Sequence, residues 1–129
     1  MFGKLKNSLY LCKINLRIMA TRASIVMKEN GKPMVAVYKH WDGYPSGLGK
    51  SLEEIIMGGK ITNGLGAQCK LGEVFNGAGC LFASIISILK EKPGDVYMTS
   101  LDGVGSSGEE YIYEIDVNDK NVNLTHKQL

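Results

Sequence analysis

Apolar and polar residues alternate in two neighbouring stretches of the chain, residues 21–28 and 33–40. Successive side chains of a strand point to opposite faces, so this alternation predicts two β-strands. Asn30-Gly31 lies between them, and this dipeptide readily supplies the two positive φ angles that a type I′ turn requires. The pattern therefore predicts a β-hairpin.

Two later stretches have the spacing of helices. In residues 48–57 apolar side chains recur every three or four positions, Ser46 or Ser51 is a suitable cap, and Gly58-Gly59 would end the helix. The buried stripe of this helix would consist of Leu52, Ile55 and Ile56. Residues 78–90 are apolar on nearly all sides, with Asn76 as a cap, which predicts a central core helix.

Three further strands are expected in the C-terminal part of the chain, at residues 95–100, 109–117 and 122–126. The predicted order of elements is then ββ-α-α-βββ. This order indicates a single α+β domain over residues 19–129, in which a largely antiparallel five-stranded sheet has two helices packed on one face.

Two glycine-rich segments interrupt these elements, at residues 58–79 and 101–108. The first is long for a loop in a small domain, so we expect a short helix or strand near residues 68–74. The second has the composition of a flap with glycine hinges, or of a disordered connection.

Charge is distributed unevenly. Residues 1–18 carry four basic and no acidic side chains, which leaves 11 of the 15 basic and all 13 acidic ones for the rest, a balance of −2. We therefore expect a basic N-terminal tail upstream of a functional start at Met19. An extra edge strand is the alternative, since Ile14, Leu16 and Ile18 alternate. The domain itself is not basic, so duplex nucleic acid is not an expected partner.

The cysteines and the hydropathy exclude some classes of protein. Cys12, Cys69 and Cys80 are odd in number and have no CxxC spacing, which argues against a disulfide framework and a zinc site. No apolar run reaches the ~20 residues of a membrane span. We expect a cytoplasmic protein without metal, cofactor or membrane association.

The densest group of candidate functional residues follows the predicted hairpin, in the sequence His40-Trp41-Asp42-Gly43-Tyr44-Pro45. Its turn dipeptides Asp-Gly and Tyr-Pro predict a loop, which we call the His40–Tyr44 loop. Trp41, the only tryptophan, and Tyr44 can stack on a base or a sugar, which indicates ligand binding. Alternatively, the two rings close the end of the sheet and Asp42 caps the turn.

His40 and Asp42 are also the candidates for catalysis. Two residues apart on a strand, they would share a face, so that Asp42 could orient the imidazole or both could hold a metal. The sequence contains no HExxH motif and no EF-hand loop. Asp102, Glu109 and His126 are the residues that could complete a catalytic group.

Two glycine-containing helix starts are candidate anion sites. Residues 47–51, Gly-Leu-Gly-Lys-Ser, end like a Walker A loop, but Tyr44 stands where that pattern needs its first glycine. A looser anion site with Lys50 remains, and Asn76 opens the second helix in the same way. The alternative is that these glycines let a helix pack closely.

Arg22 is the only arginine after Met19. Its guanidinium would bind a phosphate or carboxylate of a ligand, or pair with Glu114 or Asp116 of a neighbouring strand.

Residues 19–51 resemble the opening of small, largely uncharacterised proteins encoded by tailed bacteriophages and prophages. The resemblance is carried by Ala20-Thr21-Arg22-Ala23-Ser24-Ile25, the Asn-Gly hairpin, Val37-Tyr38, the His-Trp-Asp-Gly-Tyr-Pro sequence, and Gly47, Gly49 and Lys50. It implies a viral or prophage origin, an accessory role inside the host cell and a start at Met19. It implies no catalytic residues.

Our leading hypothesis is a non-enzymatic phage accessory protein that acts in the host cytoplasm. It would bind a small phosphate-containing ligand, nucleotide-like, or a host protein through the His40–Tyr44 loop, with Arg22, Lys50 and Asn76 as further ligand-binding candidates. One alternative is a small hydrolase or phosphoesterase that uses His40 and Asp42. Another is a structural virion or assembly component without a ligand site. The open edges of the sheet also permit a homo-oligomer.

Overall fold

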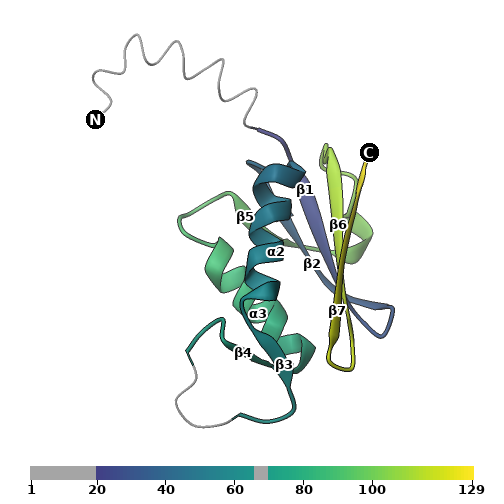
Figure 1. Cartoon of the computed structure of the whole chain (residues 1–129). Coiled ribbons are helices and arrows are strands. Elements are labelled where there is room, and N and C mark those ends of the chain that lie inside the picture. Colours follow the sequence, from purple (N-terminus) through teal and green to yellow (C-terminus); the bar gives the residue numbers. More distant parts are fainter. Residues whose placement is uncertain (1–19, 66–69) are drawn as a thin grey trace, which may run out of the picture.

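The computed structural model describes residues 20–65 and 70–129, and its main elements follow the predicted order (Figure 1). Five strands form one sheet in the order β5-β2-β1-β6-β7. The strands are β1 (Ala23–Glu29), β2 (Lys32–Lys39), β5 (Val96–Thr99), β6 (Tyr111–Asn118) and β7 (Asn121–Gln128). The helices α2 (Lys50–Met57) and α3 (Gly77–Leu89) pack on one face of this sheet. The predicted α+β class is confirmed. The basic segment of residues 1–18 lies outside the described residues.

The N-terminal hairpin forms as predicted. Asn30 and Gly31 have φ angles of 52° and 79°, as a type I′ turn requires. The register of β1 against β2 shifts between Met27 and Lys28, which is a β-bulge next to the turn.

The sheet contains one parallel pair that the sequence did not indicate. β1 lies between β2, to which it is antiparallel, and β6, to which it is parallel from Ala23–Tyr111 to Glu29–Val117. The other neighbours, β2 with β5 and β6 with β7, are antiparallel. The sheet is thus largely antiparallel, but its centre joins two hairpins from opposite ends of the chain.

Both helices bury apolar side chains against the face of the sheet formed by alternate residues of β1, β2 and β6. The largest contributors to this core are Ile25, Met27, Val37, Leu48, Leu52, Phe75, Leu81, Ile85, Tyr113 and Ile115. α3 supplies Leu81, Phe82 and Ile85 to the core, as predicted for a core helix, but it is not enclosed on all sides. Ala83 and Ser87 are exposed on one flank, and Ile88 near its C-terminal end is 38% exposed. Among the described residues, no helix has the length and apolarity to cross a membrane.

The predicted serine caps are not used. A π-helical turn, η1 (Pro45–Gly49), precedes α2, and the main-chain N–H groups of Gly47 and Leu48 donate to the carbonyls of Tyr44 and Asp42. Because the main chain already satisfies these donors, neither Ser46 nor Ser51 is needed.

Asn76 does precede α3, but its side chain accepts from Gly64 N–H at 2.7 Å instead of capping the helix. The glycine-rich segment before α3 holds a short parallel pair, β3 (Lys60–Thr62) with β4 (Val74–Asn76). The element predicted near residues 68–74 overlaps residues 66–69, which lie outside the described residues.

Residues 101–108 are fastened to the second face of the sheet and do not form a free flap. The segment starts with a 3-10 turn, η2 (Leu101–Gly103), and is held by the carboxylate of Glu109, which is only 6% exposed. This carboxylate accepts from Ser24 Oγ at 2.6 Å, Gly105 N–H at 2.8 Å and Ser107 N–H at 2.7 Å. Burial raises the pKa of Glu109, but these hydrogen bonds outweigh it, so the pKa is lowered.

Glu109→Gln should lower the free energy of unfolding by about 1–3 kcal/mol at neutral pH, because one buried donor loses its charged acceptor. Because the pKa of Glu109 is lowered in the folded protein, its carboxylate stabilises the fold at pH values above 4.5, the ordinary pKa of the group. This stabilisation is lost as the pH falls through the lowered pKa. The difference in the free energy of unfolding between the wild-type protein and Glu109→Gln, measured with urea, should therefore become smaller in acid. Glu110→Gln, at an exposed neighbouring side chain, is the control. Equal losses from both substitutions would contradict the role of Glu109.

Candidate functional site

The His40–Tyr44 loop is anchored to the sheet at Gly43. Its N–H donates to the carbonyl of Thr21 at 2.8 Å, and its own carbonyl accepts from the buried hydroxyl of Tyr113 at 2.7 Å. A Cβ atom at this position would lie 2.7 Å from both Ala23 Cβ and the Thr21 carbonyl oxygen. Glycine is therefore required here by close approach to β1. Burial raises the pKa of Tyr113 to about 12, so its phenol remains a donor.

The glycines of residues 47–49 also serve packing. A Cβ atom on Gly47 would lie 2.7 Å from the ring of Tyr44 and from the Asp42 carbonyl oxygen, and one on Gly49 would lie 3.2 Å from the ring of Tyr113. The N–H groups of Gly47 and Gly49 both donate to the Tyr44 carbonyl. These donors are not free for an anion, so the packing alternative explains the glycines.

Asp95 ties the loop to the segment after α3. Its carboxylate accepts from Lys39 Nζ at 2.7 Å and from Trp41 N–H at 3.0 Å, while its carbonyl accepts from His40 N–H at 2.8 Å. Burial raises the pKa of Asp95, but the hydrogen bonds and the nearby lysines outweigh this effect and lower it. The Lys39–Asp95 ion pair therefore fixes where the backbone of Trp41 lies.

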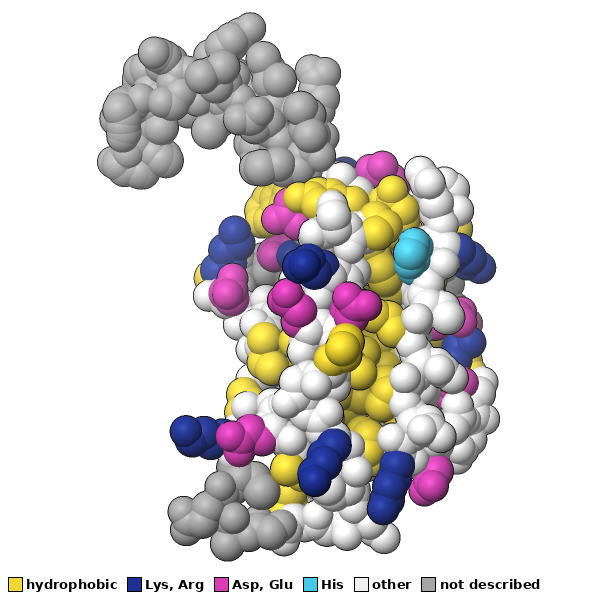
Figure 2. Space-filling view, viewed as in Figure 1, with side chains coloured by type: hydrophobic (Ala, Val, Ile, Leu, Met, Phe, Trp, Pro, Cys, Tyr) yellow, Lys and Arg dark blue, Asp and Glu magenta, His cyan; other side chains and the backbone are white. Residues whose placement is uncertain are grey.

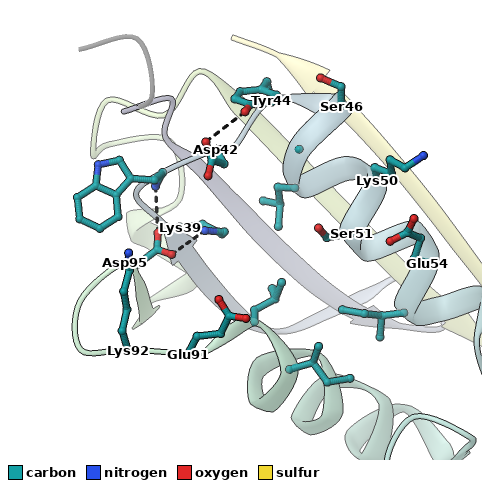
Figure 3. Close-up of a pocket in the computed structure, with 16 residues that line it drawn as sticks. Lys39, Asp42, Tyr44, Ser46, Lys50, Ser51, Glu54, Glu91, Lys92 and Asp95 are labelled. Atoms are coloured by element: carbon teal, nitrogen blue, oxygen red, sulfur yellow. Dashed lines mark hydrogen bonds and ion pairs between the residues drawn. The ribbon is translucent and has the colours of Figure 1, made fainter. Parts of the chain in front are cut away.

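A cavity of about 790 Å³ lies between the His40–Tyr44 loop, the start of α2 and the end of α3 (Figure 3). Four of the predicted site residues line it: Trp41, Asp42, Tyr44 and Lys50. Hydroxyls of Ser46 and Ser51 and the apolar side chains of Leu48, Ile55, Ile88 and Leu89 complete much of the wall. Lys50, Ser51 and Glu54 come from α2 on one side, and Glu91 and Lys92 come from the segment after α3 on the other, with Lys92 extending towards Asp95.

The predicted His40–Asp42 pair is not formed. Nδ1 of His40 lies 2.9 Å from the hydroxyl of Tyr38, and the carboxylate of Asp42 accepts from the hydroxyl of Tyr44 at 3.2 Å. The strand ends at Lys39 and Asp42 has a φ of 57°, so the strand alternation that would align the two side chains does not continue. Within the described residues, no group of three potential metal ligands occurs.

Arg22, His40 and Asn76 do not line the cavity. Arg22 donates to the carbonyl of Ser107 at 3.2 Å; the alternative partners, Glu114 and Asp116, bond instead to Lys28 and to Gly31 N–H. His40 packs edge-on against the indole of Trp41, with ring centroids 4.9 Å apart. Its contribution to the cavity is thus indirect, through the position of that ring.

Sequence reasoning missed several residues of the cavity, of which Lys92 is the most informative. Its ammonium lies 4.8 Å from the centre of the Trp41 ring, a cation–π contact. Glu54, Glu91 and Asp95 were missed as well. No local pattern marks these positions, because they reach the cavity only through the packing of α3 beside α2.

Tyr113→Phe should lower the free energy of unfolding by about 1–2 kcal/mol, because the Gly43 carbonyl loses its buried donor. Since the native pKa of about 12 exceeds the ordinary value of 10.0, the phenol stabilises the fold below pH 10 and this contribution is lost as pH rises towards 12. In urea unfolding, the difference in the free energy of unfolding between the wild-type protein and Tyr113→Phe should be smaller at pH 11 than at pH 8. Tyr111→Phe, on the same strand, should have little effect; if it costs as much, the hydrogen bond is not the cause.

Asp95→Asn should destabilise the fold by about 1–3 kcal/mol, because Lys39 loses its carboxylate partner. The emission of Trp41, the only tryptophan, should shift to longer wavelength as its backbone anchor loosens. Asp102→Asn, on the exposed η2 turn, is the control. An unchanged emission spectrum and unchanged melting temperature in Asp95→Asn would rule out this role.

Comparison with known proteins adds no functional assignment: no family model, curated protein or solved structure matches this chain.

Proposed function

We propose that this chain is a non-enzymatic accessory protein of a tailed bacteriophage that binds a nucleotide-like, phosphate-bearing ligand in the cavity beside the His40–Tyr44 loop. The observation that carries the binding proposal is that Trp41, Tyr44, Lys50 and Lys92 surround one cavity. The phage origin, and action in the cytoplasm of the host cell, rest on the resemblance of residues 19–51.

We assign the indole of Trp41 to stacking on the base of the ligand. Its indole is half-buried, supported from one side by the edge of His40 and positioned through its backbone by Asp95. A ring held in this way loses little freedom when a base stacks on it. Stacking of a base on an aromatic side chain contributes about 1–3 kcal/mol.

The phosphate is assigned to Lys50 and Lys92. Three lysines and four carboxylates line the cavity, and Lys39 is already paired with Asp95. Among the described residues, Lys50 and Lys92 form no ion pair, and the ammonium of Lys92 lies over the Trp41 ring, 4.8 Å from its centre. With Lys39 paired to Asp95, the lining keeps two lysines and the carboxylates of Asp42, Glu54 and Glu91, so these charges sum to −1. They would repel a triphosphate more strongly than a monophosphate, so we assign the site to a ligand with a single phosphate group.

The absence of a His40–Asp42 pair supports binding over hydrolysis. His40 faces Tyr38 and lies outside the cavity lining, so the phosphoesterase alternative has no oriented general base beside the proposed ligand. The carboxylates of Glu54 and Glu91 are suited to accept hydrogen bonds from ribose hydroxyls.

Isothermal titration with nucleoside 5′-monophosphates, the matching nucleosides and the triphosphates tests the proposal. We expect the monophosphates to bind most tightly. Trp41→Ala should weaken them by about fivefold to a hundredfold, the equivalent of the stacking energy. Lys92→Met should weaken the preference of the protein for the monophosphate over the bare nucleoside, because Lys50 alone then remains for the phosphate.

Tyr97→Ala and Lys127→Met are the matched controls, because both side chains are exposed and lie outside the cavity lining. Binding that is absent for every nucleotide, or that Trp41→Ala leaves unchanged, would overturn the proposal. Capture of a host protein that depends on Trp41, without nucleotide binding, would assign the loop to protein recognition instead.

A further inference from the structure

We infer that the open edge of β7 is a self-association surface, on which β7 of a second copy of this chain pairs in antiparallel fashion about a two-fold axis. No residue of β6 or β7 lines the cavity described above, so self-association at this edge is independent of the proposed ligand site.

The outer edge of β7 presents a regular row of main-chain donors and acceptors. β7 is eight residues long and is the last strand of the sheet. Leu129 N–H donates to the Glu110 carbonyl just beyond the β6–β7 ladder. The main-chain N–H and C=O groups of the odd-numbered residues of β7 therefore point towards β6. Because the direction alternates along a strand, the main-chain groups of Val122, Leu124, His126 and Gln128 face outward.

β7 has few of the features that usually prevent edge pairing, and its one lysine, Lys127, lies near its C-terminal end. It contains no proline, and its register with β6 runs without a bulge from Asn121 to Gln128. The opposite edge, β5, differs: it is four residues long and follows Pro93-Gly94. Short edge strands and nearby prolines protect a sheet edge, so within residues 20–65 and 70–129 β7 is the edge more open to pairing.

The sequence of β7 is complementary to itself, which favours a second copy as the occupant. With Leu124 opposite Leu124 of the second copy, Val122 lies opposite His126, and every outward-facing group of these residues meets a partner. On the other face Asn121 lies opposite Lys127 and Asn123 opposite Thr125. No two like charges face each other, and the two leucines meet at the centre.

An apolar surface beside this edge also needs covering. Figure 2 shows hydrophobic side chains gathered in a column down the middle of one face of the molecule. Tyr111, Val122 and Leu124 of β6 and β7 are partly buried against the core. Val122 also lines a second cavity, of about 540 Å³, with Ile56 and Met57, of which Met57 is 77% exposed. A second β7 would cover the outer flank of this surface.

The full-length protein tests the inference in a dilution series. Sedimentation velocity should show a species of twice the chain mass that dissociates on dilution. Amide hydrogen exchange, read residue by residue by NMR, should show protection of Val122, Leu124 and His126 that is lost on dilution. The amides of Asn123 and Thr125, which bond to β6, should stay protected at all concentrations.

Charged substitutions at the centre of the pairing give a second test. Leu124→Lys and Leu124→Glu should each be monomeric, because like charges would face each other across the axis. Mixing the two variants should restore a species of twice the chain mass. Thr125→Lys, one residue along, should remain dimeric, because position 125 faces Asn123. Circular dichroism checks that each variant is folded.

Three results would overturn the inference. A monomer at all concentrations with fast-exchanging even-numbered amides would leave the edge without an occupant. Protection of those amides that does not depend on concentration would assign the edge to residues 1–19 of the same chain. Self-association that Leu124→Lys does not weaken would place the interface elsewhere on the molecule.

Discussion

The hydrogen bond from the Tyr113 hydroxyl to the Gly43 carbonyl holds the His40–Tyr44 loop in place. It joins β6 to the loop that leaves β2, while the N–H of Gly43 joins the same peptide region to Thr21, just ahead of β1. Two neighbouring chain segments are thereby fixed to one loop residue that cannot carry a side chain. α2 begins at Lys50, a few residues after Gly43, so the same hydrogen bonds also fix where the α2 wall of the cavity lies.

Electrostatics fix the other side of the same loop. The Lys39–Asp95 pair is mostly buried, and each partner makes the burial of the other tolerable. Asp95 also accepts from the backbone of Trp41, so the tryptophan is placed by its main chain while its ring remains half-exposed. A ring that is fixed in position and only partly buried is suited to binding, since little order must be imposed when a ligand arrives.

Local patterns in the sequence predicted the elements well but not their three-dimensional neighbours. The Asn30-Gly31 turn, both helices and the strands after α3 follow from periodicity and turn chemistry, which depend on adjacent residues. The pairing of β1 with β6, and the arrival of Lys92 at Trp41, depend on packing between distant segments. The glycines of residues 47–49 suggested an anion site, yet their close contacts with Tyr44 and Tyr113 indicate that they serve packing.

The parallel pairing of β1 with β6 has a consequence for synthesis of the protein. Translation delivers β1 early, yet its neighbour on one side is made only near the end of the chain. Until Tyr111–Val117 has left the ribosome, the β1–β2 hairpin has an unpaired inner edge, and Ile25 and Met27 lack their cover from β6. Contacts between distant segments are slow to form, and unpaired edges aggregate. This domain therefore completes its core only when the C-terminal hairpin emerges, and a chain that stops before β6 would be a substrate for chaperones and proteases.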